Sequence, residues 1–65
     1  MSFAENLKYL RKLNKIDQTK LASALNVSAK TISHWETGYT EPSITQLINL
    51  ANFFDITVDE LIDRK

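Results

Sequence analysis

Apolar residues recur at intervals of three and four along most of the chain, and this spacing predicts helices rather than strands. The alternation of apolar and polar residues that is typical of a half-buried strand does not occur. We therefore expect an all-α domain of five short helices packed around one core. The recurring apolar residues are Phe3, Leu7, Leu10 and Leu13; Leu21, Ala22 and Leu25; Val27, Ile32 and Trp35; Ile44, Leu47, Leu50, Ala51 and Phe54; and Val58, Leu61 and Ile62.

A residue that can cap a helix stands at the start of each predicted helix. Serine, threonine and aspartate side chains accept hydrogen bonds from the free N–H groups of a first turn. At three of the five starts a glutamate or glutamine follows three positions later, which is the spacing of a reciprocal capping box. The expected caps are Ser2, Asp17, Ser28, Ser43 and Thr57; the capping boxes use Glu5, Gln46 and Glu60; and the expected ends lie at Asn14, Asn26, Gly38 and Asp55.

The segment 26–38 has one apolar and one polar face. Ile32 and Trp35 are three residues apart and share a face, which favours a core position for Trp35 over stacking on a base. Only three or four residues separate this helix from the one before it, so the two must cross steeply, as in a helix-turn-helix. A helix that anchors two large side chains and displays small polar ones indicates contact with another molecule. The outward residues are Ala29, Lys30, Thr31, Ser33, His34 and Thr37.

Length and composition limit the kinds of protein that this chain can be. Sixty-five residues allow one domain, which we assign to residues 1–65, either whole or as the N-terminal part of a longer protein. The chain has no cysteine and one histidine, which excludes a disulfide scaffold and a zinc site built from thiolates or several histidines. We expect no metal and no cofactor. No apolar run approaches the ~20 residues that span a bilayer, and no signal peptide is evident, so we expect a cytoplasmic protein without membrane contact.

The charges balance overall but are unevenly distributed. Residues 1–38 carry six basic and three acidic side chains, a net charge of +3. Residues 39–65 carry two basic and five acidic side chains, a net charge of −3. A polarised molecule can present a positive face to phosphates although its net charge is zero. Charge alone is equally consistent with ordinary solvated surfaces.

The ordered set of residues resembles the phage-repressor/Cro-type helix-turn-helix domain, which has the lambda-repressor-like fold. The resemblance extends from Leu7 to Leu61, and it implies a domain in which helices two and three form the helix-turn-helix. It also implies binding to operator DNA, usually as a dimer, in bacteria and their phages. The matching residues are Leu10, Arg11, Gln18, Leu21, Ala22, Val27, Ser28, Ile32, Ser33, Trp35, Glu36, Gly38, Pro42, Leu47, Leu50, Ala51, Phe54, Ile56, Asp59 and Leu61.

The resemblance also implies roles for individual residues. Gln18 matches a glutamine that meets a phosphate and braces a side chain of the recognition helix. Arg11 and Glu36 match a largely buried salt bridge between the first and third helices. The positions that reach base edges are Ala29, Lys30, Ser33 and His34, and the further positions that approach the DNA backbone are Thr31, Thr37, Tyr39 and Thr40.

The four expected base-contacting side chains have suitable chemistry for the major groove, where each base pair presents a distinct pattern of donors, acceptors and methyl groups. Lys30 can donate to guanine O6 and N7. His34 can donate to the same atoms or, when neutral, accept from adenine or cytosine amino groups. Ser33 can do either, and the Ala29 methyl can pack on thymine. As isolated residues, Lys30 could equally be a solvated lysine and His34 an exposed histidine.

Two departures from the family pattern affect the expected mode of recognition. The recognition face lacks the glutamine, arginine and asparagine that often form paired hydrogen bonds to one base, so DNA shape and deformability should contribute more. Lys20 replaces a common acidic residue and adds a charge that could face a phosphate. With a pI near 6.5, nonspecific attraction should be modest, and we expect two copies to act together.

Three classes of function fit the sequence to different degrees. A DNA-binding transcriptional regulator, a repressor of a palindromic operator associated with the nucleoid, fits the displayed helix face. Its dimer contacts are expected in the acidic C-terminal half, near Ile48, Phe53 and Ile62. The alternative is a protein-interaction module, and a protein partner such as an antirepressor or a toxin stays open. An enzyme is disfavoured because no nucleophile stands beside a base; Ser33 and His34 are adjacent and diverge on a helix.

Overall fold

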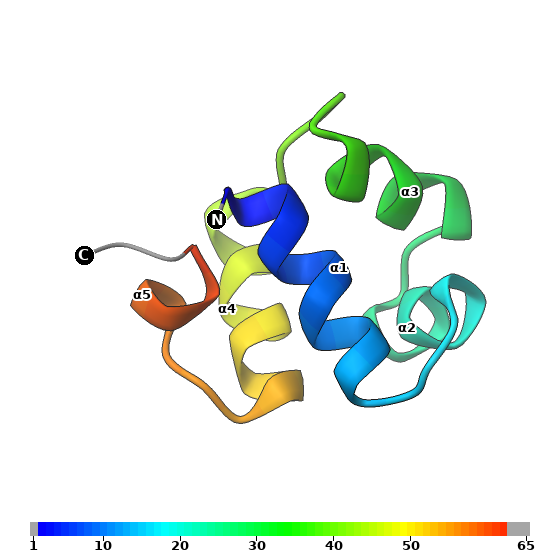
Figure 1. Ribbon diagram of the computed structural model, residues 1–65. Coiled ribbons are helices and arrows are strands. Elements are labelled where there is room, and N and C mark those ends of the chain that lie inside the picture. The colour runs from blue at the N-terminus through cyan, green and yellow to red at the C-terminus, as the bar shows by residue number, and fades with distance from the viewer. Residues whose placement is uncertain (1, 63–65) are drawn as a thin grey trace.

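Five helices form within residues 2–62, which are the residues that this computed structural model describes (Figure 1). No strand occurs among these residues, so the expected all-α class and the number of helices are confirmed. None of the helices is long and apolar enough to span a lipid bilayer over this part of the chain. Their bounds are α1, Phe3–Leu13; α2, Gln18–Leu25; α3, Ala29–Thr37; α4, Ile44–Phe54; and α5, Val58–Leu61.

Every helix begins at the capping residue that the sequence predicts. Each cap side chain accepts a hydrogen bond from the backbone N–H three residues later, and all three expected capping boxes form. In the first of them, hydrogen bonds from the backbone and hydroxyl of Ser2 hold the pKa of Glu5 below its ordinary value. Asn26, Gly38 and Asp55 end three helices in the left-handed conformation, with φ of 60°, 80° and 58°. Local capping chemistry thus fixes the helix boundaries.

Each helix contributes one leucine or isoleucine with no exposed surface to a single core. The smaller buried residues Ala22 and Ala51, together with Trp35, complete this cluster. Because it takes side chains from all five helices, the core holds the helix-turn-helix and the C-terminal helices in one unit. The fully buried residues are Leu7, Leu21, Ile32, Leu50 and Leu61.

Two residues assigned to the core stripes by their spacing are exposed instead. The prediction that Ile44 lies on the inner face of α4 is wrong, because its side chain is 77% exposed. Ile44 is the first residue of α4, and the helix reaches the core only a turn later, at Leu47. Leu13 is 61% exposed at the last position of α1, beyond the final contact of that helix with the core at Leu10. In both helices the apolar stripe extends one turn further than the core.

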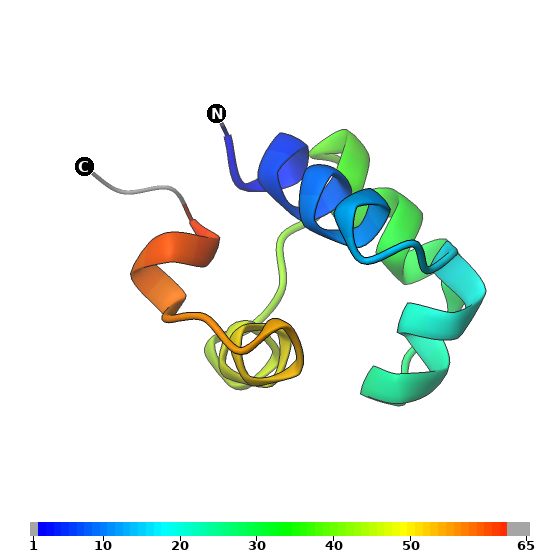
Figure 2. The same cartoon turned by 60° about the horizontal axis from the view of Figure 1, so that its bottom comes forward.

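Helix α1 lies between the helix-turn-helix and α5 (Figures 1 and 2). It packs against α3 along one side, and the two helices run side by side in both views. Near its start, Asn6 is buried and its Nδ2 donates to the carbonyl oxygens of Glu60 and Leu61, at 2.9 and 2.7 Å. Sequence reasoning did not identify Asn6. Its hydrogen bonds attach the four-residue helix α5 to α1.

Candidate nucleic-acid interface

The turn between α2 and α3 sets the direction of the candidate recognition helix. It spans only residues 26–28, and Asn26 reverses the chain by adopting φ 60° and ψ 42°. The Val27 N–H donates to the carbonyl oxygen of Ala22 at 2.9 Å, and Ala22 itself is buried. The small side chain at that position allows the two helices to pack closely. The predicted helix-turn-helix is therefore present in α2 and α3.

One face of α3 is buried against the rest of the domain. Ile32 has no exposed surface and Trp35 is 2% exposed, so Trp35 is a core residue and is unavailable for stacking on a base. Glu36 lies on the same side and is also buried. These three side chains leave the helix little freedom to rotate or slide relative to the domain. The rest of its surface can then be presented in a fixed orientation.

The four expected base-contacting residues differ in how much they project. Lys30 is exposed, whereas Ser33 and His34 are half-buried. Ala29 was expected to face outward, but it is half-buried and packs against the core. As the first residue of α3, it lies next to the turn that α2 covers, which explains its partial burial. Lys30 thus offers the longest exposed side chain of the set.

The expected backbone-contacting residues of α3 and its following loop form local contacts. The Thr31 hydroxyl lies 2.9 Å from the Ser28 hydroxyl, beside the helix cap. The Thr37 hydroxyl donates to the His34 carbonyl oxygen at 3.2 Å, so its proton is already used within the helix. Tyr39 and Thr40 are exposed in the loop after Gly38. Thr37, Tyr39 and Thr40 are thus exposed and Thr31 is half-buried, and their contact with a DNA backbone stays a prediction.

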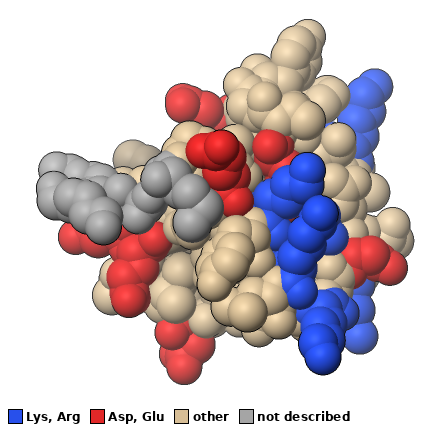
Figure 3. All heavy atoms as spheres, in the orientation of Figure 1, with Lys and Arg blue, Asp and Glu red and all other residues tan. Residues whose placement is uncertain are grey.

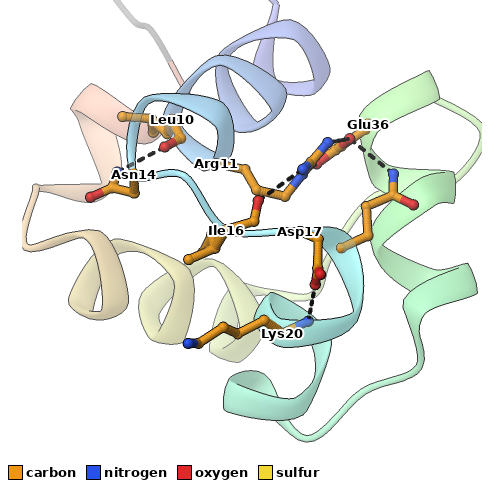
Figure 4. Close-up of polar contacts among 8 residues, drawn as sticks. Leu10, Arg11, Asn14, Ile16, Asp17, Lys20 and Glu36 are labelled. Atoms are coloured by element: carbon orange, nitrogen blue, oxygen red, sulfur yellow. Dashed lines mark hydrogen bonds and ion pairs between the residues drawn. The ribbon is translucent and has the colours of Figure 1, made fainter.

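A buried ion pair fixes the C-terminal end of α3. Arg11 of α1 donates through Nε and Nη2 to the two carboxylate oxygens of Glu36, at 2.6 and 3.1 Å, and both side chains are largely buried (Figure 4). The third donor of Arg11, Nη1, reaches the carbonyl oxygen of Ile16 at 2.9 Å. The hydrogen bonds to Glu36 raise the pKa of Arg11. The bridge implied by the resemblance is present and joins α1, the loop before α2, and α3.

Gln18 joins the same network. Its Nε2 donates to Glu36 Oε1 at 3.1 Å. Glu36 belongs to α3 and lies on its buried face, so Gln18 braces this helix from the side of the core. The contact of Gln18 with a phosphate stays a prediction. The carboxylate accepts but cannot donate, so it turns the amide nitrogen of Gln18 inward. Gln18 thereby links the first residue of α2 to the last turn of α3.

The charges are also separated in space. In Figure 3, basic side chains form a band down the middle and right of the molecule, over α1 and toward the helix-turn-helix. Acidic side chains surround this band, and a group of them lies at the lower left, near α4 and α5. On this face the basic side chains therefore gather over α1 and toward the helix-turn-helix, while acidic side chains lie around them.

The chain belongs to the helix-turn-helix family, whose model matches residues 7–61. It is 40% identical over 62 residues to the HTH-type transcriptional activator BcrR of Enterococcus faecalis, a match that covers 95% of this chain and 30% of that protein. The fold resembles that of the P22 c2 repressor solved in complex with a synthetic operator, with a TM-score of 0.92 and 31% identity. That match covers all of this chain and 98% of the repressor chain.

The same fold also occurs within larger proteins. Hydroxypropylphosphonic acid epoxidase from S. wedmorenis matches 92% of this chain, with a TM-score of 0.85 and 36% identity, but only 32% of the epoxidase chain is covered. The chain spans about half the length or less of the first curated relatives that it matches. The likeness to the epoxidase therefore concerns the helix-turn-helix domain and not the enzyme as a whole.

Proposed function

We propose that this chain is a sequence-specific, double-stranded DNA-binding transcriptional regulator that acts as a repressor and inserts α3 into the major groove. The observation that carries this proposal is the division of α3 into two faces. One face is anchored by Ile32, Trp35 and the Arg11–Glu36 ion pair. The other presents a lysine, a serine and a histidine to the exterior, and a major groove admits a helix of this kind.

Recognition in this proposal combines base and phosphate contacts. Lys30 donates to guanine O6 and N7. His34 donates to the same atoms or, when neutral, accepts from adenine or cytosine amino groups, and Ser33 can do either. The half-buried Ala29 offers a methyl group to thymine. Phosphate contacts fix the docking angle without carrying sequence information. The residues assigned to them are Gln18, Thr31, Thr37, Tyr39 and Thr40, assisted by backbone N–H groups at the starts of α2 and α4.

Two copies are proposed to bind together. A pair of helix-turn-helix domains reads half-sites about 34–36 Å apart on successive turns of the major groove, which implies a roughly palindromic operator. The proposed dimer contacts lie in the acidic half of the molecule, where Ile48 and Phe53 are exposed and Ile62 is half-buried. The solved complex of the P22 c2 repressor with an operator supports the DNA-binding part of this proposal. The same proposal locates the protein with the chromosome in the cytoplasm.

The decisive experiment is selection of bound sequences from a random pool of double-stranded DNA. It should be run with the unmodified chain, with Lys30→Ala and with His34→Ala. We expect a palindrome from the unmodified chain, and each substitution should relax one base pair symmetrically in both half-sites. Lys8→Ala on α1 serves as a matched control, since Lys8 is exposed and outside the proposed contacts. If neither substitution in α3 changes the selected sequence, the assignment of Lys30 and His34 is wrong.

A salt titration tests the phosphate contacts separately. The logarithm of operator affinity should fall linearly with the logarithm of salt concentration, by about 0.9 for each phosphate neutralised by a basic side chain. If Lys30 reads a base, Lys30→Ala should change the base preference and leave the slope of log affinity against log salt concentration nearly unchanged. A flat salt response of the unmodified chain would contradict phosphate contacts through basic side chains, such as the exposed Lys20 at the helix-turn-helix.

A further inference from the structure

The exposed Tyr39 makes a specific contact with the recognition helix. It follows Gly38, and its ring returns to lie beside the imidazole of His34, with ring centroids 4.8 Å apart and planes inclined at 59°. Tilted aromatic pairs at this separation are favourable. Tyr39 is 77% exposed, so the core does not hold it in this position.

The backbone of the loop explains why the ring lies there. Gly38 takes φ 80° and turns the chain back over the end of α3. The N–H groups of Tyr39 and Thr40 then donate to the carbonyl oxygen of His34, at 2.9 and 3.4 Å. The Thr37 hydroxyl donates to the same oxygen at 3.2 Å. The Gly38 N–H is also directed at this oxygen. Four donors on one carbonyl hold the loop against His34 itself, so the approach of the two rings follows from the main chain.

A neighbouring ring limits the orientations that an imidazole can adopt. His34 has two side-chain torsions, and a hydrogen bond to a base edge requires one direction of the donor or acceptor nitrogen. The Tyr39 ring occupies space on one side of the imidazole and removes orientations that point there. A residue that is already oriented loses less conformational freedom when it binds.

We propose that Tyr39 is a specificity-determining positioning residue, whose ring holds the His34 imidazole toward the base that it reads. This inference rests on the proposed function, because it assumes that His34 contacts a base. The inference gives the ring and the hydroxyl of Tyr39 different roles. The hydroxyl of Tyr39 serves the phosphate contact already assigned to it, whereas the ring acts through His34 on base preference.

Two substitutions distinguish the ring from the hydroxyl. Tyr39→Phe removes only the hydroxyl, and Tyr39→Leu removes the ring while keeping an apolar side chain. Affinity should be measured for the selected operator and for its three variants at the base pair that His34→Ala relaxes. We expect Tyr39→Leu to reduce the preference for the selected base pair by about two- to tenfold, the range of aromatic pair energies. Tyr39→Phe should lower affinity for all four operators alike and leave the preference intact.

The coupling between the two residues is tested by combining substitutions. In the His34→Ala background, Tyr39→Leu should produce no further change in base preference, because there is no imidazole to orient. Tyr9→Leu is the matched control: Tyr9 is an exposed tyrosine of α1, 52% exposed, and it should change neither preference nor affinity. Thermal unfolding of each variant verifies that the fold is retained.

A measurement on the free protein tests the orientation of the His34 ring separately from DNA binding. In NMR spectra, Tyr39→Leu should shift the ring proton resonances of His34 and give averaged side-chain couplings, whereas Tyr39→Phe should give neither effect. The inference is overturned if His34→Ala relaxes a base pair and Tyr39→Leu does not. If His34→Ala itself leaves the preference unchanged, the base contact assigned under the proposed function is wrong, and the inference fails with it.

Discussion

The buried polar side chains among residues 2–62 belong to Asn6 and Glu36, and each joins helices that are distant in sequence. Asn6 bonds across 55 positions to Leu61, near the end of α5. A four-residue helix cannot satisfy its terminal carbonyl groups by itself. The Asn6 amide supplies donors to two of them, so one polar side chain compensates for the shortness of α5.

Replacement of Asn6 by alanine should destabilise the domain by about 1–3 kcal/mol, since the Leu61 carbonyl group loses a buried hydrogen bond and the Glu60 carbonyl group loses a partly buried one. The measurement is urea unfolding followed by circular dichroism. Asn49→Ala provides the control, because Asn49 is an exposed asparagine within α4 and alanine favours helix there. Equal stability of the Asn6→Ala variant and the unmodified chain would contradict this role.

Sequence patterns predicted the roles of residues correctly where those roles depend on neighbours in the sequence. The caps and the ends at Asn26, Gly38 and Asp55 involve contacts within a few residues, and all were found. The patterns failed at Ile44, because spacing gives the direction of a side chain but not how far the neighbouring helices extend. Asn6 and the partner of Gln18 were missed because their contacts depend on the folded arrangement.

At the scale of the helix, the residue that ends α3 also affects the side chains that α3 displays. Gly38 ends it with φ 80°, and the returning loop brings Tyr39 beside His34. An added Cβ at Gly38 would meet no atom within 4 Å, so the environment does not require glycine. The backbone conformation favours it, because residues other than glycine, asparagine and aspartate are strained in the left-handed region.

We therefore expect Gly38→Ala to cost about 1–2 kcal/mol through backbone strain alone. For a domain of this size each kcal/mol lowers the melting temperature by about 4–8 °C, which calorimetry can resolve. The comparison variant is Asn26→Gly, at the left-handed end of α2. There the relief of strain is offset by the larger conformational entropy that glycine loses on folding, so the melting temperature should hardly change. A loss much larger than the strain energy would indicate a side-chain clash that the open space around Gly38 does not predict.

The helix-turn-helix itself was recognisable from the residues because its short turn, its buried pair Ile32 and Trp35 and its caps all lie within one segment. The fold class and the family are confirmed. The roles of Lys30, Ser33 and His34 toward DNA stay predictions, since they depend on a partner's base sequence. No pattern within one chain contains that information.

At the scale of the whole molecule, the Arg11–Glu36 ion pair connects the first helix to the candidate recognition helix. It spans 25 positions in sequence and is joined by Gln18 at the start of α2. Three helices thus share one polar cluster beside the apolar core. Because the charges are largely buried, removal of one partner leaves the other in an environment that disfavours a charge.

Arg11→Met should destabilise the domain by about 3–5 kcal/mol, and the double variant Arg11→Met with Glu36→Leu should recover a large part of that loss. A double-mutant cycle of unfolding free energies measures the coupling. The raised pKa of Arg11 means that its contribution is fully present at neutral pH and is lost only in strong alkali, so the cycle should give the same coupling at pH 6 and pH 8. If the double variant is as unstable as Arg11→Met alone, the unpaired charge of Glu36 is not the cause of the destabilisation.

The separation of anchored and displayed residues on α3 has an evolutionary consequence. Ile32, Trp35 and Glu36 secure the helix, while Lys30 is exposed. Most substitutions of Lys30 should therefore leave the fold nearly unchanged. Under the proposed base contact of Lys30, drift at this position in one copy of a duplicated gene would change its operator, while the other copy kept the original target. Two regulators that no longer compete for the same sites could arise in this way without passing through an unfolded intermediate.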